Sequence, residues 1–162
     1  MKKYIIMAIV ALSSLFSAYA ESGDVTIAPQ FAYATKHSMA GLGLQAQYYA
    51  LDNLRIAPEF IFYFKTDNIT AYNANLTAQY LIPKGNFTIY PLAGFSYARV
   101  RTDLIDEEGE KYSEKFNRVG ANIGVGTEYP INEMLYFFAE ERFQVMKDFN
   151  QSVTILGVRL SF

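Results

Sequence analysis

Apolar and polar side chains alternate along almost the whole chain, and this period of two is the feature that most limits its fold. Residues 70–82 show it clearly: Tyr72 and Leu76 occupy one set of positions, and Asn75 and Gln79 occupy the positions between them. Successive side chains of a β-strand point to opposite faces of its sheet. The pattern therefore predicts strands with one apolar face and one polar face.

Eight segments of about ten residues each carry this alternation, and no stretch between them keeps the period of an amphipathic helix. A tilted strand of about ten residues is long enough to cross a bilayer, whereas no apolar run after residue 20 is as long as a membrane-crossing helix needs. We predict an all-β protein, an eight-stranded antiparallel up-and-down transmembrane β-barrel. The predicted strands are 24–34, 40–50, 54–64, 70–82, 86–101, 117–129, 135–146 and 151–162.

Alternation alone also fits a soluble, lipocalin-like ligand carrier, which is a closed barrel with an apolar lining. Side-chain volume separates the two, because the interior of an eight-stranded barrel is only wide enough for side chains to fill it. The chain has 13 Phe and 13 Tyr, and large apolar side chains occupy most apolar-phase positions of the eight segments. They would not fit inside, whereas the Gly, Asn, Gln, Thr and Ser of the other face would. The apolar face is therefore predicted to contact lipid.

Residues 1–20 have the features of a secretory signal peptide, and the predicted barrel domain comprises residues 21–162. Lys2 and Lys3 precede an apolar stretch, and an Ala-Tyr-Ala triplet at 18–20 provides the small-x-small cleavage site. The alternative is an uncleaved membrane anchor, for which the apolar stretch is short. Cleavage removes two of the 14 basic residues and none of the 16 acidic ones, so the mature chain has no basic surface for nucleic acid.

The connections between the segments alternate in length, which predicts how the barrel is oriented. Outer-membrane barrels have short turns on the periplasmic side and longer loops outside the cell. The short turns are 51–53, 83–85 and 130–134, and the predicted outer connections are 35–39, 65–69, 102–116 and 147–150.

The last segment, ILGVRLSF, ends the chain on large apolar residues that share one phase, with Arg159 in the other phase. This ending and the strand rhythm resemble small bacterial outer-membrane barrels of the OmpX/OmpA type, in the porin family of outer-membrane β-barrel domains. The resemblance implies a multi-pass monomer in the cell outer membrane, with outer-membrane lipid and the barrel-assembly machinery as partners. It also implies an assembly signal made of Val158, Leu160 and Phe162.

We expect neither catalysis nor a cofactor or metal site. Barrel-type lipid A deacylases use Ser and His, but here the single histidine, His37, precedes Ser38 in the first outer connection. Neighbours in a loop do not provide the geometry of a nucleophile, its base and an orienting acid. A lipid-modifying enzyme is the alternative that a loss of activity in His37→Ala would support. Gly120, Gly124 and Gly126 are interpreted as clearance in a narrow lumen rather than as a nucleotide loop.

The predicted outer loop 102–116 is strongly acidic, with six acidic side chains against two lysines. We expect a small structural or adhesive barrel that interacts with the envelope, or with a host or other cell-surface partner, mainly through this loop. The alternative is a solvated acidic loop that deters aggregation.

Basic residues occur near the outer ends of most predicted strands, where lipopolysaccharide phosphates would lie. Arg99 and Arg101 continue the lipid-facing phase of Phe95 and Tyr97, and a guanidinium group binds phosphate through two hydrogen bonds. The alternative is that these are ordinary solvated charges at the rim of the barrel without a specific ligand. The candidate lipopolysaccharide contacts are Lys36, Lys65, Arg99, Arg101, Arg118 and Lys147.

Three arginines and three glutamates fall in the lumen-facing phase, among bulky aromatic rings. An isolated buried charge is costly, so we predict that these residues pair in a charge network that plugs the lumen. The alternative is a narrow pore for ions or small solutes. The network residues are Arg55, Glu59, Glu128, Glu140, Arg142 and Arg159.

Glu141 does not fit this scheme, because it falls in the lipid-facing phase of predicted strand 135–146. A carboxylate facing lipid costs less than the roughly 2–4 kcal/mol of a cation at the midplane, but it is still unfavourable. We therefore predict a β-bulge near Glu140 and Glu141 that turns this side chain away from lipid.

Overall fold

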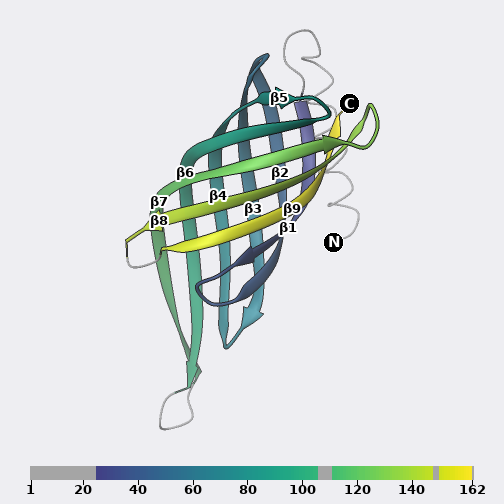
Figure 1. The fold of residues 1–162 in the computed structure, drawn as a ribbon. Helices are drawn as coiled ribbons and strands as arrows, with labels where there is room; N and C mark the ends of the chain where they lie inside the picture. The colour runs from purple at the N-terminus through teal and green to yellow at the C-terminus, as the bar shows by residue number, and fades with distance from the viewer. Residues whose placement is uncertain (1–24, 106–110, 148–149, 162) are drawn as a thin grey trace.

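The computed structural model of the protein describes residues 25–105, 111–147 and 150–161, and these residues form one closed β-barrel (Figure 1). The predicted signal peptide (1–20), residues 106–110 of the predicted acidic loop and Phe162 lie outside the described residues. The strands are β1 (Val25–Ala34), β2 (Met39–Leu51), β3 (Leu54–Thr66), β4 (Ile69–Tyr80), β5 (Ile82–Lys84), β6 (Phe87–Ile105), β7 (Lys111–Pro130), β8 (Leu135–Met146) and β9 (Gln151–Ser161).

The sheet closes because β1 pairs with β9 and β4 pairs with β6, and paired strands run antiparallel throughout the described barrel. β4 and β5 form one strand of the barrel that is interrupted at Leu81 without a change of register: Gln79 pairs with Leu92, and Ile82 pairs with Ile89. In this register, Tyr80 lies opposite Pro91 on β6. Proline has no N–H group to donate to the ladder, which accounts for the interruption. The barrel therefore has the eight strands that the sequence predicts.

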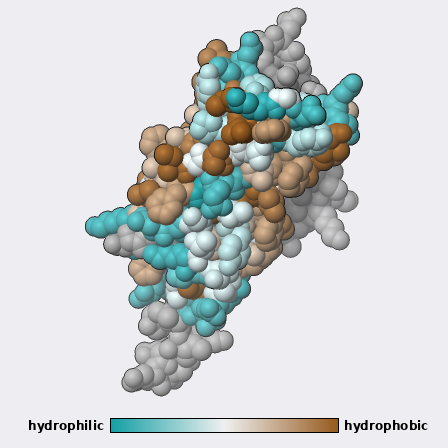
Figure 2. Space-filling view, viewed as in Figure 1, coloured by the Kyte–Doolittle hydropathy of each residue, from teal (hydrophilic) through white to brown (hydrophobic). Residues whose placement is uncertain are grey.

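The predicted alternation is confirmed. On β4, Asn73, Asn75 and Gln79 are buried in the interior, whereas Leu76 on the opposite face is 49% exposed. Large apolar side chains cover much of the outer surface, as the brown areas of Figure 2 show. This arrangement contradicts the lipocalin-like alternative, whose apolar side chains would line the interior. In the described part of the chain, no helix has the length and apolar character needed to cross a membrane.

The predicted loop 102–116 is mostly paired strand, which corrects the sequence analysis. Thr102 pairs with Glu114, and Ile105 pairs with Lys111, so β6 and β7 continue well past their neighbours. On its other side, β6 pairs with β4 only up to Thr102, which lies opposite Ile69. On its other side, β7 pairs with β8 only from Gly120 onward, which lies opposite Met146. The β6–β7 hairpin therefore projects beyond the barrel wall, as Figure 1 shows at its lower end.

The predicted bulge at Glu140 and Glu141 is wrong. Pairing between β7 and β8 is unbroken from Thr127 with Ala139 to Gly124 with Arg142, and β9 pairs with the same part of β8 without a shift. Glu141 therefore does face outward. The Thr154 hydroxyl on β9 donates a hydrogen bond of 2.6 Å to Glu141 Oε2, which partly offsets the cost of a carboxylate on this face.

Candidate functional site: the charged interior of the barrel

The six charged residues of the predicted lumen network are all buried inside the barrel. They come from four strands: β3 provides Arg55 and Glu59, β8 provides Glu140 and Arg142, and the other two are Glu128 on β7 and Arg159 on β9. Each occupies an inward position of a strand whose alternate residues face outward. Among the described residues, the buried charged side chains are thus three positive and three negative ones.

One group, which we call the acidic triad, consists of Glu59, Arg142 and Glu140. Arg142 binds Glu59 through two hydrogen bonds, with Nη1 2.6 Å from Oε1 and Nη2 2.9 Å from Oε2. Its Nε donates to Glu140 Oε2 at 2.8 Å, and its Nη2 contacts the same oxygen. Two carboxylates therefore share one guanidinium, which leaves this triad with one excess negative charge.

The second group, the basic triad, consists of Arg55, Glu128 and Arg159. Arg55 Nη1 and Arg159 Nη2 each lie 2.9 Å from a different oxygen of Glu128. The Tyr49 hydroxyl accepts a hydrogen bond from both arginines, at 3.1 Å from Arg55 and 2.7 Å from Arg159. The Arg159 guanidinium also lies 3.9 Å from the centre of the Tyr136 ring, a cation–π contact.

Gln79 and Tyr90 connect the two triads. Arg55 Nε donates to Gln79 Oε1 at 2.6 Å, and Gln79 Nε2 donates to Glu140 at 3.3 Å. The Tyr90 hydroxyl donates to Glu140 at 2.8 Å, and Arg55 lies 4.9 Å from the centre of the Tyr90 ring. The opposite charges of the triads therefore balance through one continuous network, as buried charges require.

Neutral polar side chains extend the network toward the outer end of the barrel. Gln30, Gln45 and Asn75 donate hydrogen bonds to Glu59 at 2.7, 3.1 and 2.6 Å. Asn75 also belongs to a layer of amides and a hydroxyl that bond to one another across the lumen: Asn73, Asn75, Ser96, Asn122, Gln144 and Gln151. The lumen is therefore occupied by mutually bonded side chains over this stretch.

Buried apolar side chains occupy the outer end of the lumen, and the sequence analysis missed them. This apolar cap includes Met39, Tyr63, Val100, Met146 and Val153, all buried close to the outer strand ends. These residues could have been found by following the inward phase of each strand to its outer end. Charged residues in the lumen-facing phase are rare and stand out in the sequence. An apolar residue near a strand end is common and does not.

Two interior glycines provide the clearance expected of a narrow lumen. A Cβ atom on Gly126 would lie 2.3 Å from the Tyr90 ring, and one on Gly157 would lie 2.5 Å from the Phe138 ring. Gly126 is one of the three glycines singled out from the sequence. These positions let aromatic rings lie across the lumen beside the charged network.

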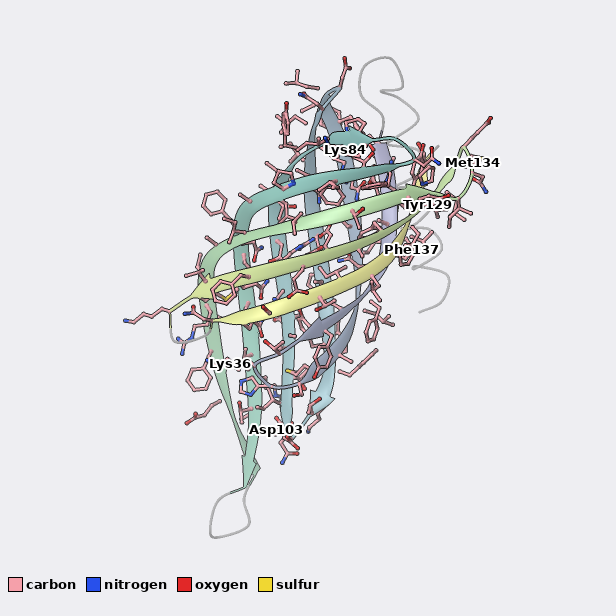
Figure 3. The ribbon with its side chains drawn as sticks, in the orientation of Figure 1. Lys36, Lys84, Asp103, Tyr129, Met134 and Phe137 are labelled. Carbon is pink, nitrogen blue, oxygen red and sulfur yellow. The ribbon has the colours of Figure 1, made fainter. Side chains whose placement is uncertain are left out.

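The candidate lipopolysaccharide contacts lie toward the outer end of the barrel but do not form one cluster. Lys65 and Arg101 both bind Asp103, with Nζ and Nε at 2.7 and 3.0 Å from its carboxylate oxygens. The hydrogen bond from Lys65, together with that from Arg101, lowers the pKa of the Asp103 carboxyl. Figure 3 labels Lys36 and Asp103 toward one end of the barrel and Lys84 and Met134 at the other.

The remaining basic candidates have separate surroundings. Arg99 lies 6.0 Å from the centre of the Tyr72 ring on the outward face, and Arg118 lies 5.6 Å from the centre of the Phe116 ring. Arg118 belongs to the inward phase of β7, since its strand neighbour Val119 is 71% exposed and faces outward. Lys147 is exposed at the end of β8, and Lys36 is exposed in the turn after β1.

The other residues singled out from the sequence are the histidine and serine of the first outer connection and those of the predicted assembly signal. His37 and Ser38 lie in the tight turn between β1 and β2. No group of three His, Cys, Asp or Glu side chains within the described residues could hold a metal ion. Val158 and Leu160, from the predicted assembly signal, occupy the outward phase of β9, and Leu160 is exposed.

Comparisons with known proteins agree with this architecture. The family model of the outer membrane protein beta-barrel domain matches residues 8–162. The N-terminal β-barrel domain of Pseudomonas aeruginosa OprF is similar in fold, with a TM-score of 0.65 and 19% identity, covering 87% of this chain and 100% of that chain. A search of curated proteins gave no match.

Two other solved barrels share the fold at low identity. Ail, the attachment invasion locus protein of Yersinia pestis, has a TM-score of 0.60 and 14% identity, covering 86% of this chain and 97% of that chain. Neisserial surface protein A has a TM-score of 0.57 and 21% identity, covering 86% of this chain and 96% of that chain.

Proposed function

This chain belongs to the family of outer membrane protein beta-barrel domains, and from that premise we propose that it is a non-conducting barrel that presents its β6–β7 hairpin to a partner outside the cell. As an outer-membrane protein it has one end available to the exterior. We assign to the exterior the end at which the β6–β7 hairpin continues past its neighbouring strands.

The observation that carries the proposal is the one-sided pairing of the outer part of β7. From Lys111 to Val119 this strand pairs with β6, whereas its pairing with β8 starts at Gly120. The other side of this stretch therefore presents backbone N–H and C=O groups that can add an extended segment of a partner protein as a further strand. Charged side chains such as Glu114 and Lys115 keep this edge soluble until a partner binds.

The similar proteins support a role at the cell surface. Ail is named as an attachment invasion locus protein, and it has been solved with the heparin analogue sucrose octasulfate. For this chain, we propose contact with a host or other cell-surface protein through the hairpin edge.

Shortening the hairpin tests the proposal. A variant in which a two-residue Asn-Gly turn replaces residues 103–113 joins Thr102 to Glu114 and leaves the barrel wall intact. It removes the part of the hairpin that projects farthest, including residues 111–113 of the one-sided edge, and leaves the edge too short to add a strand of the proposed length. We expect bacteria that display this variant to lose adhesion to cultured animal cells and to one another, with heat-modifiable gel mobility unchanged. Glu133→Ala, in the turn at the other end of the barrel, is the control and should adhere normally. Full adhesion by a folded, shortened variant would contradict the proposal.

A second candidate function is binding of lipopolysaccharide phosphates at the outer end of the wall. The supporting observation is that Arg99 and Arg101 on β6, and Lys65 on β3 on the other side of β4, lie toward one end of the wall. Arg99 lies 6.0 Å from the centre of the Tyr72 ring. Asp103 engages Lys65 and Arg101, so Arg99 is the stronger candidate of the three. Unchanged lipopolysaccharide retention in the Arg99→Ala, Arg101→Ala double variant would count against this site.

A further inference from the structure

A carboxylate lies in the middle of the lipid-facing wall. Glu141 occupies an exposed, outward position about midway along β8, between Leu135 and Met146. Its lateral neighbours are Val125 on β7 and Thr154 on β9, and its neighbours in the same phase of β8 are Ala139 and Phe143. An ionisable side chain at this depth is unfavourable, which makes it a candidate for function.

Glu141 belongs to a polar strip on three adjacent strands. Thr127 on β7 pairs with Ala139, and Thr154 donates its hydroxyl proton to Glu141 Oε2 at 2.6 Å. In Figure 2, hydrophilic and intermediate colours interrupt the hydrophobic ones in the middle of the visible face, where Figure 1 shows β8 and β9 crossing the view. The central outward positions of β2, β3 and β4 are instead Leu44, Phe60 and Leu76, all exposed and apolar.

The hydrogen bond from Thr154 does not satisfy the carboxyl group of Glu141. A carboxylate has about four lone-pair sites on its two oxygens, and this bond occupies one of them. The hydrocarbon core of a bilayer supplies neither water nor other donors. The described basic side chains Lys36, Lys65, Arg99, Arg101 and Lys147 are toward the outer end of the wall, and Lys84 is at the opposite end. A further donor for Glu141 must therefore come from another molecule at the same depth.

We propose that the Thr127–Glu141–Thr154 strip is a lateral contact between two copies of this chain in the membrane. Copies inserted in the same orientation hold equal residues at equal depth, so a two-fold axis normal to the membrane brings the two strips together. Such a contact is self-complementary, because each strip has a carboxyl acceptor in Glu141 and an exposed hydroxyl donor in Thr127. Ala139 beside Glu141 is small enough to let the two walls approach closely, as small residues do at contacts within lipid.

This contact is independent of the proposed role of the β6–β7 hairpin. It replaces the expectation of a monomer with a pair of barrels whose charged interiors stay separate. Within each barrel, the Glu141–Thr154 hydrogen bond orients the carboxyl group. Between barrels, the Thr127 hydroxyl of the second copy provides the donor that lipid lacks, because the single hydroxyl proton of Thr154 is already donated to Glu141 of its own barrel.

Cysteine cross-linking in membranes tests the contact directly, because the chain has no cysteine of its own. Ala139→Cys places a single thiol beside Glu141, and Ala74→Cys places one beside Phe60 on the opposite, apolar part of the wall. We expect an oxidised, full-length dimer from Ala139→Cys with about ten times the yield from Ala74→Cys, the size of effect that one or two polar contacts in lipid produce. Equal yields from the two variants would overturn the proposal.

Variants of Glu141 in the Ala139→Cys background separate a specific contact from mere proximity. Glu141→Leu should reduce the dimer to the yield of Ala74→Cys, whereas Glu141→Gln, which retains hydrogen-bonding groups, should keep most of it. Heat-modifiable gel mobility must show that each variant is folded; if Glu141→Leu does not fold, the comparison of Ala139→Cys with Ala74→Cys still decides. An unchanged yield in folded Glu141→Leu, or a cross-link to a different protein identified by mass spectrometry, would also overturn the proposal.

Discussion

Arg142 on β8 donates two hydrogen bonds of 2.6 and 2.9 Å across the lumen to the carboxylate of Glu59 on β3. Its Nε donates a third hydrogen bond to Glu140 on its own strand. These bonds join opposite walls of the barrel. The partners are far apart in the chain, so the contact stabilises closure of the sheet rather than any one hairpin.

Arg142→Met should destabilise the barrel, because it leaves Glu59 and Glu140 buried without their cation. Removal of one partner from a buried ion pair costs about 3–5 kcal/mol. Urea titration of the protein in lipid vesicles, followed by gel mobility, measures this loss. The matched control adds Glu59→Gln and Glu140→Gln to Arg142→Met, which removes the uncompensated charges and should restore most of the stability. A single variant as stable as the parent would contradict the network.

Glu140→Ala should weaken the barrel without opening it. The substitution removes the acceptor of Tyr90 and one partner of Arg142, but the polar layer and the apolar cap still fill the lumen. Planar-bilayer recordings of the parent and of Glu140→Ala should both lack steady conductance steps. Reproducible steps from the purified parent protein would instead support the narrow-pore alternative.

Gly126→Ala should destabilise the barrel through overpacking. Its Cβ would lie 2.3 Å from the Tyr90 ring, and inserted methyl groups in packed interiors cost about 1–3 kcal/mol. Tyr90→Leu in the same chain removes the ring from this space and should recover part of the loss that Gly126→Ala causes. Urea midpoints of the four proteins in this double-mutant cycle measure the coupling, and strictly additive midpoints would rule out the clash.

The Asp103 carboxyl should titrate below its ordinary pKa in the folded barrel, because Lys65 and Arg101 stabilise its charged form. A lowered pKa in the folded state means that the contact stabilises the hairpin base above the ordinary pKa. This contribution disappears as the pH falls through the lowered value. An NMR titration of the labelled carboxyl in a nanodisc measures the shift. Lys65→Ala should move the pKa back toward its ordinary value, while Lys147→Ala should leave it unchanged.

The barrel could be predicted from the sequence because lipid imposes a simple rule on each strand. Predicted strand 135–146 coincides with β8, and predicted strand 54–64 ends two residues before β3 does. The alternation of apolar and polar side chains is not required where strands extend beyond the membrane. The outer ends of β6 and β7 carry charged residues such as Asp103 and Glu114 without an apolar face, so their pattern is typical of a loop although they are paired.

The members of the charged network could be predicted, but their partners could not. Alternation determines which side chains point inward, whereas their relative heights depend on strand tilt and register. Arg142 therefore meets both Glu59 on β3 and Glu140 two residues away on β8. The same limit applies to Glu141: its hydrogen bond with Thr154 depends on the β8–β9 register, so the sequence pattern favoured a bulge that does not exist.

The continuous ladder between β6 and β7 also determines how the barrel carries a mechanical load. It runs without a break from Ile105 and Lys111, outside the wall, to Thr88 and Glu128, near its inner end. This ladder holds β6 and β7 together as one unit. Antiparallel hydrogen bonds lie perpendicular to their strands, so a pull along the hairpin loads in shear the ladders that join β6 to β4 and β7 to β8. Force that a tethered cell applies to the hairpin would therefore spread along the wall of the barrel instead of peeling the hairpin open at its base.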